Sequence, residues 1–299
     1  MRVGVSLHRT GPAGELADLA RRLEDDGYDQ LQVADHLGFV APFSALAVAA
    51  TVTTRLRLGT LVCNNDFWNP VLLAREAATL ALLSEGRFEL GLGAGHAHVE
   101  YEASGIAYDP PSSRIDRLTE SVAILGPLLA GERVTHDGAH HRAVDAATDV
   151  EHPPVPLLVG GNGDRVLALA AREADAVGIT GFTSGTGQTH SVLSHFGWDG
   201  LAERIAHVHA AAGDRAGGPE VQVLVQYVAT GDRAQLAAEA SAPFAQPADV
   251  LLESPFVMLG SVDDHVEHCV RLRELGVARL TAFDGRGAEL LAPVIARLG

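Results

Sequence analysis

The sequence contains no lysine, so all 22 basic residues among its 299 are arginines. Without lysine, Schiff-base catalysis and a lysine-held phosphate are both excluded. The arginines are scattered, and 38 acidic residues give a formal net charge of −16. A field of that sign repels nucleic acids and anionic lipids, so we expect neither a nucleic acid nor a membrane as a partner.

Cysteine and long apolar runs are scarce as well. The two cysteines, Cys63 and Cys269, lie far apart and form no CxxC pair or disulfide framework, which fits a reducing compartment. The apolar run at the N-terminus is too short for a signal peptide. No window approaches eighteen apolar residues, so no transmembrane helix is expected. These absences predict a cytoplasmic protein.

Strand-like and helix-like patterns alternate along the whole chain. Short apolar runs predict strands, and each is followed by a segment with apolar residues at helical spacing, such as 15–26 after the first strand. Near-continuous apolar strands that alternate with helices favour a parallel sheet buried on both faces. Eight units in this length predict an α/β fold, a (β/α)8 TIM barrel, with a doubly wound open sheet as the alternative. The eight strands are expected at 3–7, 28–34, 55–62, 87–93, 155–161, 175–180, 221–230 and 278–283.

No linker-like or low-complexity segment interrupts the pattern, so we predict a single domain over residues 1–299. Two segments are longer than an ordinary connection, at 131–155 and 181–197. Long excursions on a barrel are usually lids, binding loops or interfaces.

The predicted strands end in polar and glycine-rich residues. In a barrel the carboxyl ends of the strands meet at one face, where active sites lie, so these residues are expected to lie close together there. They are His8, Asp35, His36, Cys63, Asn64, Asn65, the run Gly93 to His98, the run Gly160 to Gly163, and Thr180 to Phe182.

Glycines are concentrated at two of these strand ends. In "RFELGLGAGHAHVEY", Gly91, Gly93 and Gly95 occupy every second position, which indicates either a tight turn or a place where something approaches the backbone closely. The run "VGGNGDR" ends a strand and opens a helix. Its backbone N–H groups and the helix dipole suit a phosphate, although a capped tight turn explains the same residues.

His96 and His98 form an HxH pair, a pattern that supplies two metal ligands in some barrel hydrolases. Such enzymes add further histidines and an aspartate at later strand ends. Here the later strands end in glycine, threonine and phenylalanine instead, so we predict no metal site.

Taken in order, the motifs resemble the bacterial luciferase-like family, specifically its F420-dependent branch. The resemblance covers about residues 1–185 and 255–298 and includes "VADHLG", "LRLGTLVCNN", "NPVLLAREAATLALLSEGRFELGLGAG", "PLLVGGNGDRVLALAAREADAVG" and "GSVDDHVEHCVRLRELGVARL". It implies a luciferase-like TIM barrel with insertions in the loops at the C-terminal face, one of them near strand 7. It also implies a flavin or deazaflavin bound in the barrel mouth.

The resemblance assigns residues to the cofactor. Gly93 and Gly95 would let a ring system and its ribityl phosphate tail lie against the backbone, and the peptide bond between Leu61 and Val62 matches a position where relatives have a cis peptide. The phosphate would be held by N–H groups of the second glycine run. The full set of expected cofactor-binding residues is Asp35, His36, Leu61, Val62, Cys63, Gly93, Ala94, Gly95, Val99, Gly160, Gly161, Asn162 and Gly163.

Two histidines are implied as catalytic. His36 matches the histidine that points at the redox centre of the deazaflavin, and Asp35-His36, where FMN-dependent relatives show Glu-His-His, favours coenzyme F420 over FMN. His96 stands where the sugar-phosphate dehydrogenases of the branch have a proton-donating glutamate. An imidazole with a pKa near 6.5 could do that work at neutral pH. The substitution and the missing lysines argue against sugar-phosphate dehydrogenation.

The resemblance therefore predicts an F420-dependent oxidoreductase, a reductase or dehydrogenase that moves a hydride between the deazaflavin C5 and a small organic substrate. The alternatives are a reduced-FMN-dependent luciferase-like monooxygenase and a non-catalytic flavin- or deazaflavin-binding barrel. We expect a homodimer, as relatives often are. Candidate substrate-pocket residues are His8, Asn64, His190, His195, Phe196 and Trp198, of which several could equally be packing under a loop.

Overall fold

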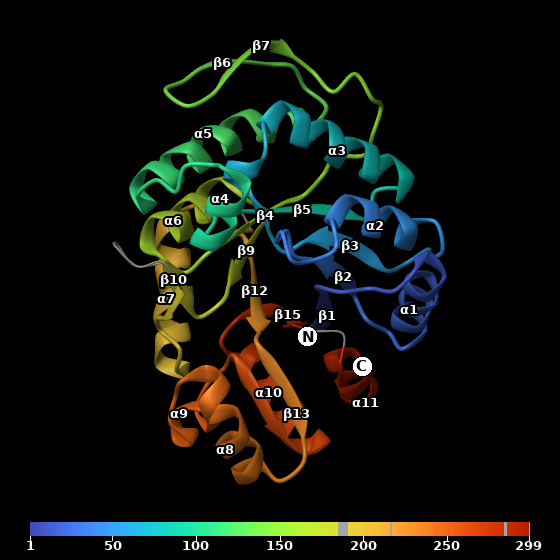
Figure 1. Cartoon of the computed structure of the whole chain (residues 1–299), viewed down its shortest axis with the longest axis vertical. Coiled ribbons are helices and arrows are strands. Elements are labelled where there is room, and N and C mark those ends of the chain that lie inside the picture. The colour runs from blue at the N-terminus through green and yellow to red at the C-terminus, as the bar shows by residue number, and fades with distance from the viewer. Residues whose placement is uncertain (185–190, 216, 284–285, 299) are drawn as a thin grey trace.

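The computed structural model describes residues 1–184, 191–215, 217–283 and 286–298. Among these residues, a closed parallel barrel forms the centre of the molecule (Figure 1). Its strands follow the order β3-β2-β1-β15-β12-β9-β8-β5-β4, and a further pairing of β3 with β5 closes the ring. The strands are β1 (Arg2–Leu7), β2 (Gln30–Val33), β3 (Arg57–Thr60), β4 (Cys63–Asn64), β5 (Phe88–Gly93), β8 (Leu157–Gly160), β9 (Ala176–Ile179), β12 (Glu220–Val225) and β15 (Val277–Phe283).

The barrel prediction is confirmed. β3 lies within the expected strand 55–62, and the short β4 follows it after Leu61 and Val62, beyond the expected end. With β3 and β4 taken as one interrupted strand, eight barrel strands of the described chain correspond to the eight expected apolar runs. Helices connect the barrel strands, and their apolar faces pack on the outside of the barrel. They are α1 (Ala13–Asp25), α2 (Pro42–Ala50), the 3-10 turn η1 (Asn65–Phe67), α3 (Pro70–Leu83), α4 (His98–Ser104), α5 (Pro111–Leu129), α6 (Asp164–Glu173), α7 (Trp198–Ala212), α10 (Val262–Glu274) and α11 (Arg286–Leu298).

Local sequence fixes where several helices begin. Asn69 accepts hydrogen bonds from the N–H groups of Val71 and Leu72, and Pro70 occupies the first turn of α3, where its missing N–H costs nothing. At α10, Ser261 and Asp264 form a reciprocal capping box. None of the described helices has the length and apolar character that crossing a membrane requires.

The chain leaves the barrel after β12 and returns to it at β15. The expected strand 221–230 divides at Gln226: β12 stays in the barrel, and β13 (Tyr227–Thr230) pairs in parallel with β14 (Val257–Gly260). The helices α8 (Arg233–Phe244) and α9 (Ala248–Leu252) lie between β13 and β14 in the sequence. In Figure 1 these elements form the orange lobe at the bottom of the view. The sequence patterns predicted neither β14 nor the helices α8 and α9.

The two long excursions contain hairpins. The segment 131–155 forms the antiparallel pair β6 (Val134–Asp137) and β7 (Arg142–Ala146), which lies over α5 and α3 at the top of Figure 1. The segment 181–197 forms the pair β10 (Phe182–Ser184) and β11 (Ser191–Leu193), next to the ends of the barrel strands in the sequence.

The barrel interior contains polar groups as well as aliphatic ones. Arg279 on β15 donates to both carboxylate oxygens of Glu89 on β5, at 2.9 Å each, and both side chains are 2% exposed. Above this ion pair, Gln222 of β12 donates to Gln32 of β2 at 2.9 Å. These bonds join strands that are not neighbours in the sheet, so they cross the interior and tie opposite walls together.

Candidate functional site

A cavity of about 450 Å³ lies at the carboxyl ends of the barrel strands. Its walls come from the ends of β2, β3, β5, β8, β9, β12 and β15, together with α4, α5 and the β10 strand. This is the face on which barrel enzymes carry their active sites. Of the expected site residues, the cavity wall includes Asp35, His36, Leu61, Val62, Asn64, Gly93, Ala94, Gly95, His96, Gly160, Gly161, Asn162 and Gly163.

His36 is held by a carboxylate that the sequence patterns did not single out. Glu100, in the first turn of α4, lies with Oε1 2.7 Å from Nδ1 of His36, and the two side chains are 14% and 26% exposed. Because a carboxylate accepts, Nδ1–H of His36 donates this bond, and Nε2 carries the lone pair in the neutral ring. Glu100 therefore fixes both the orientation and the tautomer of His36.

His96 meets His36 edge to face, with ring centroids 5.2 Å apart. Desolvation in the mouth, together with the nearby His36 and Arg114, lowers the pKa of His96 to about 4. Its imidazole is exposed to solvent in the open cavity, which weakens this decrease. The lowered pKa favours the neutral ring, which can accept a proton or donate its N–H; the role of His96 in proton transfer stays a prediction.

Glycines at the ends of β5 and β8 allow the side chain of Val62 to pack closely against these strands. A Cβ on Gly93 would lie 2.7 Å from Cγ2 of Val62, and one on Gly160 would lie 2.9 Å from Cγ1 of the same residue. Gly95 has φ +71°, and its missing side chain leaves room for the hydroxyl of Tyr101. The peptide bond between Leu61 and Val62 is cis, as the resemblance implied. Val62 thus sits in the groove left by the glycines and forms a smooth part of the cavity wall.

The second glycine run forms a polar end of the cavity. Gly163 precedes α6, and no side chain caps the N–H groups of this helix. A Cβ on Gly163 would point into open space. Asn162 is 2% exposed: its Nδ2 donates to the carbonyl of Ser194 at 2.7 Å, while its Oδ1 has no partner. Free N–H groups at a helix N-terminus, beside an unpaired buried acceptor, suit a ligand that carries both phosphate and hydroxyl groups.

Arg114 is a buried cation in the wall, with 1% of its surface exposed. Its guanidinium donates to the carbonyls of Asp109 at 3.1 Å and Ala94 at 3.2 Å, and also to the carbonyl of Gly95. It lies 4.4 Å from the ring centroid of Tyr108. These bonds fix the loop that follows β5, so Arg114 positions Gly95 and His96.

Several predicted residues lie outside the cavity wall. Cys63 is fully buried below it, and Val99 is 68% exposed on α4. His8 packs between Phe39 and Phe283, with centroids 5.2 and 5.4 Å away.

Two further candidates for the substrate pocket, His195 and Phe196, are not among the residues that line the cavity. His195 contacts Ser194 and Glu203, and Phe196 is 7% exposed and stacks on Phe256 at 5.5 Å. The ring of Phe196 packs behind that of the wall residue Phe182, with centroids 6.0 Å apart. His190 lies outside the described residues.

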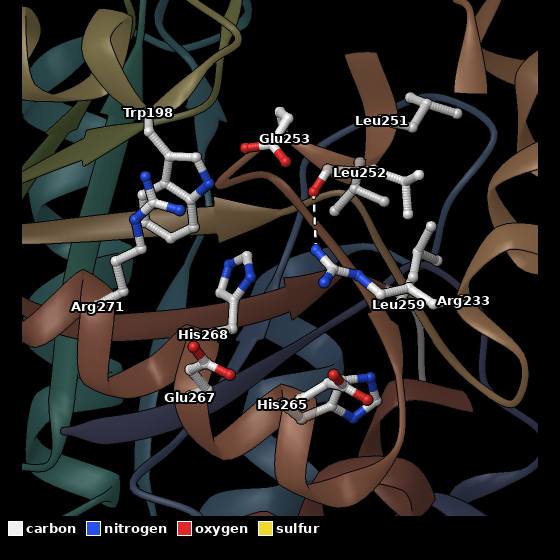
Figure 2. A pocket seen from close by; sticks show the side chains of 12 residues that line it. Trp198, Arg233, Leu251, Leu252, Glu253, Leu259, His265, Glu267, His268 and Arg271 are labelled. Atoms are coloured by element: carbon white, nitrogen blue, oxygen red, sulfur yellow. Dashed lines mark hydrogen bonds between the residues drawn. The ribbon is translucent and has the colours of Figure 1, made fainter. Parts of the chain in front are cut away.

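Trp198 lines a second cavity of about 180 Å³, which shares no wall residue with the first (Figure 2). The guanidinium carbon of Arg271 lies 4.0 Å from the indole centroid, and the ring of His268 lies 4.9 Å away. Burial lowers the pKa of His268 to about 4, and its Nε2 is 3.0 Å from the carbonyl oxygen of Pro255. Figure 2 shows these side chains on α10 and at the start of α7, opposite Arg233.

Across the described residues, no group of three or more histidine, cysteine, aspartate or glutamate side chains is arranged to hold a metal ion.

Comparison with known proteins identifies the family. The model of the luciferase-like monooxygenase family matches residues 1–274. An F420-dependent glucose-6-phosphate dehydrogenase of Nakamurella multipartita is 36% identical over 200 residues, which is 63% of this chain and 57% of that protein. A 5,10-methylenetetrahydromethanopterin reductase of Methanolobus tindarius is 32% identical over 177 residues, 59% of this chain and 53% of that protein. The chain thus spans little more than half the length of these relatives.

Solved structures share the fold over the whole chain. A coenzyme F420-dependent tetrahydromethanopterin reductase of Methanopyrus kandleri superimposes with a TM-score of 0.78 at 17% identity, covering 100% of this chain and 99% of the other. An F420-dependent secondary alcohol dehydrogenase, solved with an F420–acetone adduct, gives 0.80 at 18% identity with the same coverage. Because the family model matches residues 1–274 and the chain forms a closed barrel, the chain belongs to the luciferase-like monooxygenase family.

Proposed function

We propose that the chain is an F420-dependent oxidoreductase that moves a hydride between the deazaflavin C5 and a small organic substrate. The observation that carries the proposal is the His36–Glu100 pair, which is hydrogen-bonded at 2.7 Å in the wall of the main cavity. The same wall contains the surface made by Val62, Gly93 and Gly160, called here the glycine shelf. The curated relatives named above include F420-dependent enzymes, which supports the choice of cofactor.

The residues of the cavity fit this cofactor. A flat ring system can lie on Val62, because the wall around it has no projecting side chain at Gly93 or Gly160. The uncapped N–H groups at the start of α6 can hold the phosphate. The unpaired Oδ1 of Asn162 can accept from a ribityl hydroxyl.

The chain's own residues supply proton transfer and orientation. When bound, F420 accepts or releases a hydride at C5. We assign Nε2 of His36 as the atom that accepts the proton of the substrate hydroxyl, because Nδ1 already donates a hydrogen bond to Glu100. The carboxylate of Glu100 then stabilises the positive charge that the ring acquires. His96 stays neutral at pH 7 and orients the substrate oxygen through its N–H or its lone pair.

Binding of cofactor tests the proposal directly. Fluorescence titration should give tighter binding of F420 than of FMN, oxidised or reduced. His36→Ala should weaken F420 binding, whereas His140→Ala, on an exposed loop residue, should leave it unchanged. Preference for reduced FMN would support the monooxygenase alternative, and oxygen consumption would then be the next assay. Binding of F420 without turnover of any substrate would support the non-catalytic barrel, and binding of neither cofactor would refute the proposal.

We also propose a homodimer and a cytoplasmic location. Cys63 and Cys269 are both buried and unpaired, as suits a reducing compartment. Light scattering after size-exclusion chromatography measures the oligomeric state. Fractionation of cells that express the natural protein measures its location.

A further inference from the structure

Part of the main cavity wall, called here the substrate half, is aromatic. Phe39, Phe182 and Phe283 come from three separate segments and all line the cavity. The ring of Phe39 packs edge to face on His36, with centroids 4.9 Å apart, and lies 6.3 Å from the ring of Phe283. An apolar surface therefore begins directly beside the histidine that we propose handles the substrate proton.

The polar groups of this half are neutral. Thr180, Thr183, Gln222 and Gln226 line the cavity. Nε2 of Gln226 donates to the carbonyl of Thr180 at 3.3 Å, which leaves its amide oxygen as an acceptor. Hydroxyl and amide groups can orient a substrate with one or two hydrogen bonds, but they do not neutralise a charge.

Arg114 is the one arginine among the described residues that line the cavity. Its Nε and Nη1 donate to three backbone carbonyls, which hold the guanidinium against the loop after β5 but do not neutralise its charge. The undescribed residues 185–190 contain no arginine, and the sequence has no lysine. Asp35 and Glu100 add negative charge to the wall, and the chain as a whole carries −16. One guanidinium against two carboxylates leaves the described wall with a net negative charge, which disfavours an anionic substrate.

We propose that the substrate is an uncharged alcohol, or the corresponding carbonyl compound, with a mostly apolar body that packs against the aromatic wall. This inference rests on the proposed function and adds the substrate class. In the oxidation, the carbinol C–H bond breaks and its hydrogen leaves with both electrons to F420, which is reduced. The hydroxyl proton passes to Nε2 of His36, and the carbon–oxygen double bond forms. The site thus differs from that of a sugar-phosphate dehydrogenase, the activity for which several of the curated relatives are named.

Matched probes test the substrate class on protein already loaded with F420. We would measure the binding of cyclohexanol and benzyl alcohol, of the para-carboxylate of benzyl alcohol, and of glucose 6-phosphate. The neutral alcohols should bind at least about tenfold more tightly than either anion, a difference of about 1.4 kcal/mol. Thr183→Arg places a cation in the wall and should narrow or reverse this preference. Thr119→Arg makes the same charge change on the exposed side of α5 and should not alter it.

The outcomes separate the inference from the function beneath it. If F420 binds and glucose 6-phosphate or the carboxylate binds as tightly as the alcohols, the substrate class is wrong and the proposed function stands. The substrate class is also wrong if F420 binds but no neutral alcohol does. Failure to bind F420 at all would remove the proposed function, and the inference with it.

Discussion

Replacing Glu100 with glutamine tests whether His36 acts as the proton acceptor. Glu100→Gln keeps the shape of the side chain and removes the charge that lies 2.7 Å from Nδ1 of His36. A hydrogen bond to a charged group contributes about 1.5–3 kcal/mol. If this stabilisation is realised only when the ring takes a proton, kcat should fall by about 10- to 150-fold, at about 1.36 kcal/mol per factor of ten. Both side chains are partly exposed, so the lower end of the range is expected.

The assay is steady-state reduction of F420 with the neutral alcohol that turns over fastest, together with F420 titration of each variant. Binding of F420 should change little in Glu100→Gln, because the carboxylate acts through His36. Glu102→Gln, on an exposed residue of the same short helix, is the matched control and should match the unmodified protein. A kcat within about twofold of the unmodified value would refute the assignment, and equal losses in both variants would trace the effect to α4 itself.

Three further perturbations test the surrounding structure. Glu89→Gln removes the charge 2.9 Å from the buried guanidinium of Arg279, which keeps only the 3.5 Å contact with the half-exposed Glu220 as an ion pair, at a cost of about 3–5 kcal/mol. With an unfolding entropy of about 2.1 cal/mol/K per residue over 299 residues, calorimetry should show a Tm lower by about 5–8 °C. Burial lowers the pKa of His268 to about 4, so the folded state is penalised when this ring must take a proton. The free energy of unfolding should therefore decrease as the pH falls from 6.5 towards 4. The urea midpoint of His268→Gln should decrease less over this pH range than that of the unmodified protein. Gly93→Ala places a methyl group 2.7 Å from Val62 and should weaken F420 binding, which Val62→Ala should restore in the double variant.

The barrel could be predicted from the sequence because its evidence is local. Each apolar run is short and is followed by a segment of helical period, and eight repetitions leave few architectures to choose from. The same logic placed His36 and His96 at one face, since both follow barrel strands, and the structure puts their rings 5.2 Å apart. The strand β14 escaped prediction because it pairs with β13 only after the chain has left the barrel.

Other features of the site depend on tertiary contacts that no local pattern records. Glu100 lies 64 residues from His36 in the sequence, and only the packing of α4 over the mouth brings them together. The one available signal was its place in the first turn of a helix that follows a glycine-rich strand end. The lowered pKa of His96 likewise depends on desolvation in the barrel mouth and on the nearby His36 and Arg114. Trp198 was predicted for the substrate pocket from its residue type, but the start of α7 turns it towards the second cavity.

The glycine pattern shows how a correct inference about location can rest on an incomplete reason. Gly91, Gly93 and Gly160 suggested a backbone left bare for a ligand, yet Val62 fills much of that space. A Cβ on Gly91 would collide with the carbonyl of Thr60, so the glycines first allow two neighbouring strands to approach each other. With the side chain of Val62 packed against the glycines, the cavity wall at this point consists of one valine surface and has no side chains projecting from the glycine positions. A flat wall for a ring is therefore built by removing side chains from two strands and filling the gap from a third.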